Sequence, residues 1–226
     1  MLKRIKLIYF SFILISFFLG AYPFFDISFS NFFYSGNNQF IVQHYLVHKV
    51  YFYEFIIREL MLPIIVIFLL FFPIFIKFFK NIKNKFSDFN LKTKDILYIW
   101  SSALMVTIIV ENIFKNFWGR ARPVDTTIFG GQKDFTTWIN YSSECATNCS
   151  FVSGDASVGF FIACMYYITK KNIYLYLSVI FGLIIGITRI GAGAHFLSDI
   201  LMSFVLINII LFTNNYCFKQ WSKTNI

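Results

Sequence analysis

The chain contains few charged residues and few cysteines, and its cysteines are not spaced as metal ligands. Charged side chains make up 14% of the 226 residues, whereas 58% are hydrophobic and the mean hydropathy is positive. A soluble domain of this length does not need so much apolar sequence to fill its core, so the composition favours a membrane protein. None of the four cysteines belongs to a CxxC pair, which argues against a structural zinc site.

The formal net charge of +9 raises a second possibility, a nucleic-acid-binding protein. The basic residues, however, lie in short clusters between apolar runs and do not gather along one stripe. Membrane topology produces this pattern. We therefore expect contacts with membrane lipids and none with nucleic acid.

Six apolar runs approach the length of about 20 residues that a helix needs to cross a bilayer. They cover residues 5–22, 60–79, 96–114, 154–169, 172–189 and 195–213. The first run follows Lys3, Arg4 and Lys6, as a signal peptide would, but "LGAYPFF" lacks a small-x-small cleavage site, so we favour a retained helix. The predicted fold is an all-α bundle of six transmembrane helices in a single domain, 1–226, whose motif-bearing core is 111–213.

The distribution of basic residues predicts which ends of these helices face the cytoplasm. With the N-terminus inside, 13 of the 20 Lys and Arg residues lie on the cytoplasmic side and seven on the other. Because cytoplasmic loops are enriched in basic residues, we expect both termini to be cytoplasmic and the loops 23–59 and 115–153 to lie outside. In a bacterium this would be a multi-pass protein of the inner membrane with a periplasmic site.

Charged residues collect at the outer ends of the third to sixth predicted helices. They are Lys115, Arg120, Arg122, Asp155, Arg189, His195 and Asp199. Several fixed cations at one place suit a multiply charged anion, and forked guanidinium donors match phosphate oxygens. Ser153 and Gly154 add backbone N–H groups at a predicted helix N-terminus, which also favours an anion. Each cation alone would more often reach for lipid headgroups, so the prediction of a phosphate site rests on the whole set.

His195 and Asp199 are four residues apart, which on a helix places them on one face. The carboxylate would then accept a hydrogen bond from one imidazole nitrogen and leave the other as a base or nucleophile. An activated histidine beside a phosphate site indicates phosphoryl transfer. A His–Asp pair alone is often only structural.

Three ordered motifs in this region resemble a known family. "KNFWGRARP" (115–123) fits Lys, six residues, then Arg-Pro; "VSGD" (152–155) stands where Pro-Ser-Gly-His is usual; "TRIGAGAHFLSD" (188–199) fits Arg, five residues, His, three residues, Asp. The set resembles the type 2 phosphatidic acid phosphatase family, membrane lipid phosphatases related to vanadium haloperoxidases. The resemblance covers residues 115–199, and residues 1–95 contribute only topology.

The resemblance implies a role for each residue of the set. His195 would be the nucleophile that forms a phosphohistidine, and Asp199 would orient it. The residues that would hold the phosphoryl oxygens, without a metal or other cofactor, are Lys115, Arg122, Arg189, Ser153 and Gly154. Arg120 would be an accessory cation close to Arg122.

Asp155 departs from the family pattern, because that position is usually a histidine that protonates the leaving oxygen. A carboxylic acid can replace the histidine only when it is protonated, unless the leaving group needs little help. An anomeric phosphate or a diphosphate provides such a leaving group, so the departure favours the 1-phosphate of lipid A over phosphatidic acid. The stretch "NCSFVSGDAS" is also similar to the lipid A 1-phosphatase branch.

Three other functions remain open. They are hydrolysis of undecaprenyl diphosphate or another lipid diphosphate, transfer of the phosphoryl group to a second lipid, and transport of an anion. Cations at helix ends also line permeation paths. Against transport, no inverted repeat is evident in the sequence, and the polar set lies at one membrane face and not near the midplane.

Cys145 and Cys149 lie in the outer loop 115–153. If the predicted topology holds, this loop faces an oxidising compartment. The two residues are then either joined in a disulfide that braces the site beside Ser153 or are two inert thiols.

Overall fold

The computed structural model describes the backbone of residues 22–42 and 92–224, together with isolated helical positions between 7 and 18 and between 63 and 74. The first two predicted spans, 5–22 and 60–79, therefore lie largely outside the described residues. The described part of the chain is mostly helical, which agrees with the predicted all-α class.

The described elements are helices and one small hairpin. Near the N-terminus, α2 (Pro23–Phe32) leads into the antiparallel strands β1 (Tyr34–Gly36) and β2 (Gln39–Phe40). The long helical segments are α6 (Thr93–Val106), which continues as the π-helix η2 (Thr107–Phe114) and as α7 (Lys115–Phe117), then α10 (Ile173–Gly191) and α11 (Leu197–Thr224). The shorter elements are the 3-10 turns η3 (Pro123–Asp125) and η4 (Thr127–Phe129) and the helices α8 (Gly154–Phe161) and α9 (Cys164–Thr169).

Three described helical segments are long and apolar enough to cross a membrane. They are Thr93–Phe117, Ile173–Gly191 and Leu197–Trp221. These segments correspond to the third, fifth and sixth predicted spans. The fourth, 154–169, is divided between α8 and α9, because the N–H of Ala163 bonds to the carbonyl of Phe160 and breaks the regular α-helical ladder. A bundle of six transmembrane helices therefore remains a prediction.

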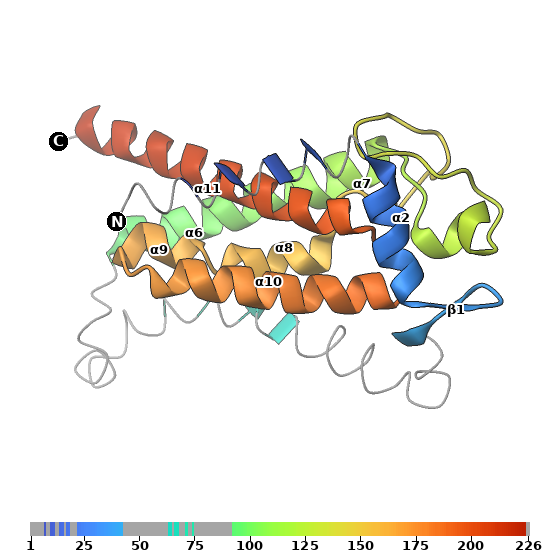
Figure 1. Cartoon of the computed structure of the whole chain (residues 1–226). Coiled ribbons are helices and arrows are strands. Elements are labelled where there is room, and N and C mark those ends of the chain that lie inside the picture. The colour runs from blue at the N-terminus through green and yellow to red at the C-terminus, as the bar shows by residue number, and fades with distance from the viewer. Residues whose placement is uncertain are drawn as a thin grey trace.

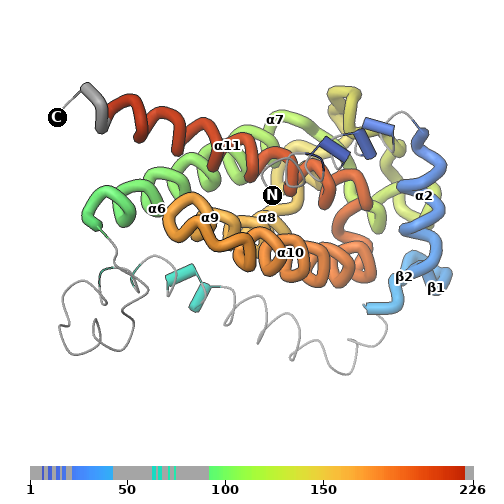
Figure 2. Tube along the Cα trace, turned by 60° about the vertical axis from the view of Figure 1, so that its left-hand side comes forward, coloured from blue at the N-terminus to red at the C-terminus, as the bar shows by residue number. Residues whose placement is uncertain are grey.

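Helices α8 and α10 pack closely because glycines lie at their contact. A Cβ added to Gly159 would be 2.7 Å from the Cα of Gly182, so the two backbones meet without a side chain between them. Small residues allow such close approach between helices in membranes. On α11, the ring of Phe204 lies 5.2 Å from that of Phe160, measured between centroids. Figure 2 shows α10 beside α8 and α9, and α11 beside α6.

Helix α2 lies across the end of the bundle where α10 ends and α11 begins (Figure 1). A small second core fixes this end: Phe40 of β2 packs against Phe129 of η4, with ring centroids 5.3 Å apart, and both belong to one buried cluster with Phe196. The cluster ties the N-terminal hairpin to the outer loop and to the residue that precedes α11. The candidate site lies at the same end.

Candidate active site

His195 is buried in the turn between α10 and α11, with 2% of its surface exposed. Gly193 has a φ of 66°, a left-handed conformation that lets the chain turn sharply after α10. The Nδ1 atom of His195 lies 2.6 Å from the backbone oxygen of Ser150. Because a carbonyl oxygen can only accept, Nδ1 carries the proton and Nε2 keeps its lone pair. This tautomer suits a nucleophile at Nε2.

Asp199 is fully buried and lies close to His195, but its nearest hydrogen-bond donors are other groups. Its Oδ2 is 3.9 Å from Nδ1 of His195, whereas it accepts from the Ser150 hydroxyl at 2.6 Å and from the N–H of Phe196 at 2.8 Å. The direct hydrogen bond expected from the four-residue spacing is replaced because α11 begins at Leu197, which leaves His195 outside the helix. Ser150 links the pair instead, through its backbone oxygen and its hydroxyl.

Burial lowers the pKa of His195 below its ordinary value, because the imidazolium form loses its hydration. The carboxylate of Asp199 opposes this shift of the His195 pKa, and the guanidiniums of Arg189 and Arg122 add to it. We therefore expect a neutral imidazole at physiological pH.

Arg189 near the end of α10 and Asp155 at the start of α8 form an ion pair. The Nε atom of Arg189 is 2.9 Å from Oδ2 of Asp155, and their side chains are 5% and 21% exposed. The antiparallel contact of the two helices brings these residues together. Asp155 is thus a partly exposed carboxylate beside a cation.

The N-terminus of α8 lies directly against Lys115 and Glu111. The Ser153 hydroxyl caps the helix by accepting from the N–H of Ala156 at 3.4 Å. A Cβ added to Gly154 would be 3.0 Å from Nζ of Lys115 and would collide with the carboxylate of Glu111. Lys115 and Glu111 also form an ion pair of 2.9 Å. The absence of a side chain at position 154 therefore lets the Lys115 ammonium reach the helix N-terminus.

Arg122 is held by the outer loop. Its Nε and Nη2 atoms donate to the backbone oxygen of Asn148 at 3.2 and 2.9 Å. Asn148 lies between Cys145 and Cys149, which the structure joins in a disulfide. The N–H of Cys149 in turn donates to the backbone oxygen of Lys115 at 3.1 Å. The disulfide loop thus contacts two residues with cationic side chains, Arg122 and Lys115.

Arg120 is fully buried, and its donors serve protein groups. Its Nη1 donates to Asp199 at 2.5 Å, its Nη2 donates to Asp26 at 2.8 Å, and its Nε donates to the backbone oxygen of Thr136 at 2.8 Å. This placement differs from the expected accessory cation beside Arg122. Because its N–H donors already bond to protein groups, Arg120 has few donors left for a phosphate.

A model of the PAP2 superfamily matches residues 96–222. This stretch contains all three sequence motifs and every residue of the site described above except Asp26. The chain belongs to the PAP2 superfamily. The match confirms the family that the motifs resembled, the type 2 phosphatidic acid phosphatases.

Three relatives of this PAP2 protein carry the name lipid A 4'-phosphatase. The relative from Francisella tularensis subsp. novicida (strain U112) is 34% identical over 149 residues, which are 62% of this chain and 67% of the relative. Those from Rhizobium etli and Rhizobium leguminosarum are 32% and 30% identical over 124 residues, which are 53% of this chain. The chain spans about half the length of the two rhizobial proteins, at 48% and 53%. No solved structure matches the chain.

The names of these relatives correct one expectation. The sequence favoured the 1-phosphatase branch, whereas the relatives are named for the 4'-phosphate of lipid A. Both names describe lipid phosphatases, and family membership together with these relatives supports an enzyme of that class.

Three buried polar residues that support the site were not expected from the sequence: Asp26, Ser150 and Ser198, of which Ser198 lies within the third motif. The only signal for Asp26 was a carboxylate within the apolar stretch "PFFDISFSNF", where an unpaired charge is costly. Ser150 follows Cys149 directly, and nothing in its spacing distinguishes it from other serines.

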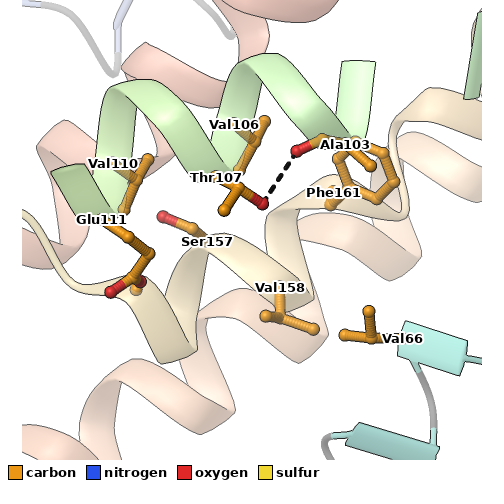
Figure 3. Close-up of a pocket in the computed structure, with 10 residues that line it drawn as sticks. Val66, Ala103, Val106, Thr107, Val110, Glu111, Ser157, Val158 and Phe161 are labelled. Carbon is orange, nitrogen blue, oxygen red and sulfur yellow. Dashed lines mark hydrogen bonds between the residues drawn. The ribbon is translucent and has the colours of Figure 1, made fainter. Parts of the chain in front are cut away.

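An apolar cavity of about 190 Å³ lies beside the PAP2 site, between the continuous helix α6–η2 and α8 (Figure 3). Gly154 and Glu111 line one end of the cavity, and Val106, Val158 and Phe161 are among the residues that line the remainder. Figure 3 shows Glu111 and Phe161 at opposite ends of this row of side chains. The cavity thus begins at the N-terminus of α8 and continues along apolar surface.

The donor set of the PAP2 site suits an anion. In the part of the chain that the structure describes, no three His, Cys, Asp or Glu side chains lie together as metal ligands would. The groups around His195 include guanidiniums, and an ammonium lies at the start of α8. Such cations bind phosphate oxygens and repel metal ions.

Proposed function

We propose that this chain is a lipid A phosphatase that uses His195 as its nucleophile. The observation that carries the proposal is the orientation of the buried His195 imidazole: its Nδ1–H donates to the backbone oxygen of Ser150 at 2.6 Å, so its Nε2 keeps a lone pair. The lone pair on Nε2 can attack phosphorus, and guanidiniums match the phosphoryl oxygens. The names of the three relatives support lipid A as the substrate.

The reaction proceeds in two steps. The Nε2 lone pair of His195 attacks phosphorus, and the bond from phosphorus to the ester oxygen breaks. Lys115, Arg122 and Arg189 neutralise charge on the three non-bridging oxygens. The phosphorylated imidazole carries added positive charge, which the Asp199 carboxylate stabilises from behind. Water then attacks phosphorus and gives a proton to the Asp155 carboxylate left by the first step, the bond from phosphorus to Nε2 breaks and returns its electron pair to Nε2, and inorganic phosphate leaves.

Asp155 supplies the proton to the leaving oxygen. The 4'-oxygen of lipid A belongs to an ordinary ring alcohol and leaves poorly as an alkoxide, so it needs a proton. Asp155 pairs with Arg189 in this structure, and a bound phosphate would compete for that guanidinium. Once phosphate takes over the Arg189 guanidinium, the Asp155 carboxyl is free to exchange a proton with the ester oxygen.

The cavity between α6–η2 and α8 accommodates one acyl chain of the lipid. Its polar end lies at Gly154, beside the Lys115 ammonium, and its walls at Val106 and Val158 are apolar. A lipid whose phosphate contacts Lys115 can therefore place hydrocarbon along these walls. Burial of that hydrocarbon is favourable by about 25 cal/mol per Å².

We place the site at the periplasmic face of the bacterial inner membrane. Lys92, Lys94, Lys170 and Lys219 line one cavity at the opposite end of the helices from Lys115. Because basic residues mark the cytoplasmic side, this cluster supports a site that faces outward and termini that face inward.

The test is phosphate release by the detergent-purified protein, in EDTA, from lipid A, undecaprenyl diphosphate and phosphatidic acid. Mass spectrometry of the lipid product separates loss of the 4'-phosphate from loss of the 1-phosphate. We expect loss of the 4'-phosphate, and no loss with His195→Ala. Loss of the 1-phosphate alone would indicate a lipid A 1-phosphatase, as the sequence first suggested. Phosphate found on a second lipid would indicate phosphotransfer. No reaction with any lipid would reject the proposal.

A further inference from the structure

Asp26 lies on α2, outside all three sequence motifs, yet its carboxylate is buried against the back of the site, with 1% of the residue exposed. Its Oδ2 accepts from Nη2 of Arg120 at 2.8 Å and from the Ser198 hydroxyl at 2.5 Å. Its Oδ1 accepts from the N–H of Ser198 at 2.8 Å. Both oxygens are therefore bound by groups that adjoin Asp199.

Arg120 connects Asp26 to Asp199. Its Nη1 donates to Asp199 and to the Ser198 hydroxyl, at 2.5 and 2.9 Å, while Nη2 donates to Asp26. The ring of Phe196 lies 4.3 Å from the guanidinium carbon, measured to the ring centroid. A planar guanidinium presents its donors in a fixed fork, so the carboxylate on one side of Arg120 fixes the position of the carboxylate on the other.

The buried group formed by Asp26, Arg120 and Asp199 carries a net negative charge. Two buried carboxylates, Asp26 and Asp199, share the single guanidinium of Arg120, so one negative charge remains. Without the Asp26 carboxylate, Arg120 would neutralise Asp199. The nucleophile would then lose the negative charge that stabilises a positively charged imidazole.

We propose that Asp26 is a positioning residue for the nucleophile. It accepts a hydrogen bond from the Arg120 nitrogen that does not contact Asp199. Asp199 is thereby held in position behind His195, and its negative charge is not cancelled by Arg120. This inference rests on the proposed function, in which His195 attacks phosphorus. It adds a residue on α2 to a site whose motifs all lie later in the chain.

The charged groups that act on His195 come from three elements. Asp199 belongs to α11, Arg189 to α10 and Arg122 to the loop after α7, while Arg120 and Asp26 act from behind Asp199. Asp26→Asn removes one negative charge from this set. We expect the His195 titration midpoint to fall by about one pH unit and kcat to fall about tenfold, which is the same free-energy change. KM should change little, because Asp26 does not touch the substrate.

Arg120→Met should shift the His195 titration midpoint in the opposite direction. It removes the only cation of the buried group and leaves two carboxylates, so the His195 midpoint should rise. The double variant Asp26→Asn/Arg120→Met removes the ion pair as a unit and keeps the charge of Asp199, so its midpoint should return close to that of the wild type. A purely structural role for Asp26 does not produce this pattern of signs.

The measurement is an NMR titration of protein labelled with ¹⁵N-histidine in detergent, with the His195 signal assigned by its loss in His195→Ala. Asp125→Asn is the matched control, because this partly exposed carboxylate pairs with Lys133 in the outer loop and the change removes the same charge. Control and wild type should titrate alike.

Midpoints that do not move, or that move in one direction in both single variants, would overturn the role of Asp26. If one single variant does not fold, the other and the double variant still give the sign of the change. The titration needs no substrate, so it tests Asp26 even if the wild type releases no phosphate from any lipid. That second result would count against the proposed function alone.

Discussion

Gly154→Ala tests whether the Lys115 ammonium must reach the N-terminus of α8. The new Cβ would collide with the carboxylate of Glu111 and would only touch Nζ of Lys115, at 3.0 Å, so it is Glu111 that has to move. The two move together, because their ion pair measures 2.9 Å. A displacement of about 1 Å at a charge that positions the substrate costs about 10²-fold in rate, so we expect kcat/KM for lipid A to fall about 10²-fold.

The fold of Gly154→Ala should survive. Both displaced groups are the ends of flexible side chains, and alanine is a better helix former than glycine by about 1 kcal/mol. Thermal unfolding followed by tryptophan fluorescence should therefore give an unchanged or slightly higher Tm. Gly159→Ala is the contrasting control, because its Cβ would meet the backbone of Gly182 at 2.7 Å and should lower the Tm.

A second substitution makes this prediction refutable. Glu111→Ala removes the carboxylate that the new Cβ would strike, so the double variant Gly154→Ala/Glu111→Ala should be about as active as Glu111→Ala alone. If the two losses multiply in the double variant, contact with Glu111 is not the cause, and our account of position 154 fails.

Three further outcomes follow from the site. Burial lowers the pKa of His195, so the acidic limb of the kcat/KM profile should lie below about pH 6.5, and a limb above that value would contradict a neutral nucleophile. Ser150→Ala removes a 2.6 Å hydrogen bond to a buried carboxylate and should lower the free energy of unfolding by about 2 kcal/mol in thermal melts, whereas an unchanged Tm would show that the bond is not needed. Val158→Trp narrows the cavity and should lower kcat/KM for lipid A more than for a soluble aryl phosphate; equal losses would count against an acyl chain there.

The sequence predicted the family, because three short motifs carry its pattern. It did not predict how His195 and Asp199 are joined. That link depends on where α11 begins, and Asp199 helps to set the boundary by accepting from the N–H of Phe196 at the start of the helix. A shift of two residues in a helix start is within the usual uncertainty of boundaries read from sequence, yet it moves His195 off the helix face.

Asp26 could not be placed from sequence for a different reason. It lies 94 residues before its partner Arg120, in a helix with no motif of its own. Contacts of this kind depend on how α2 packs across the end of the bundle. Local periodicity predicts that a segment is helical and apolar, but it does not say which distant charge its single carboxylate will meet.

The disulfide loop links the chemistry of the site to the biogenesis of the protein. Arg122 donates to Asn148, inside the loop that Cys145 and Cys149 close. The proposed topology exports this loop from the reducing cytoplasm, and disulfides form after such export. A newly inserted chain would therefore contain His195 before Arg122 is held at the phosphate site. Oxidation of Cys145 and Cys149 would then fix Arg122 there. Maturation of the enzyme would then depend on the oxidative folding system of the cell envelope as well as on membrane insertion.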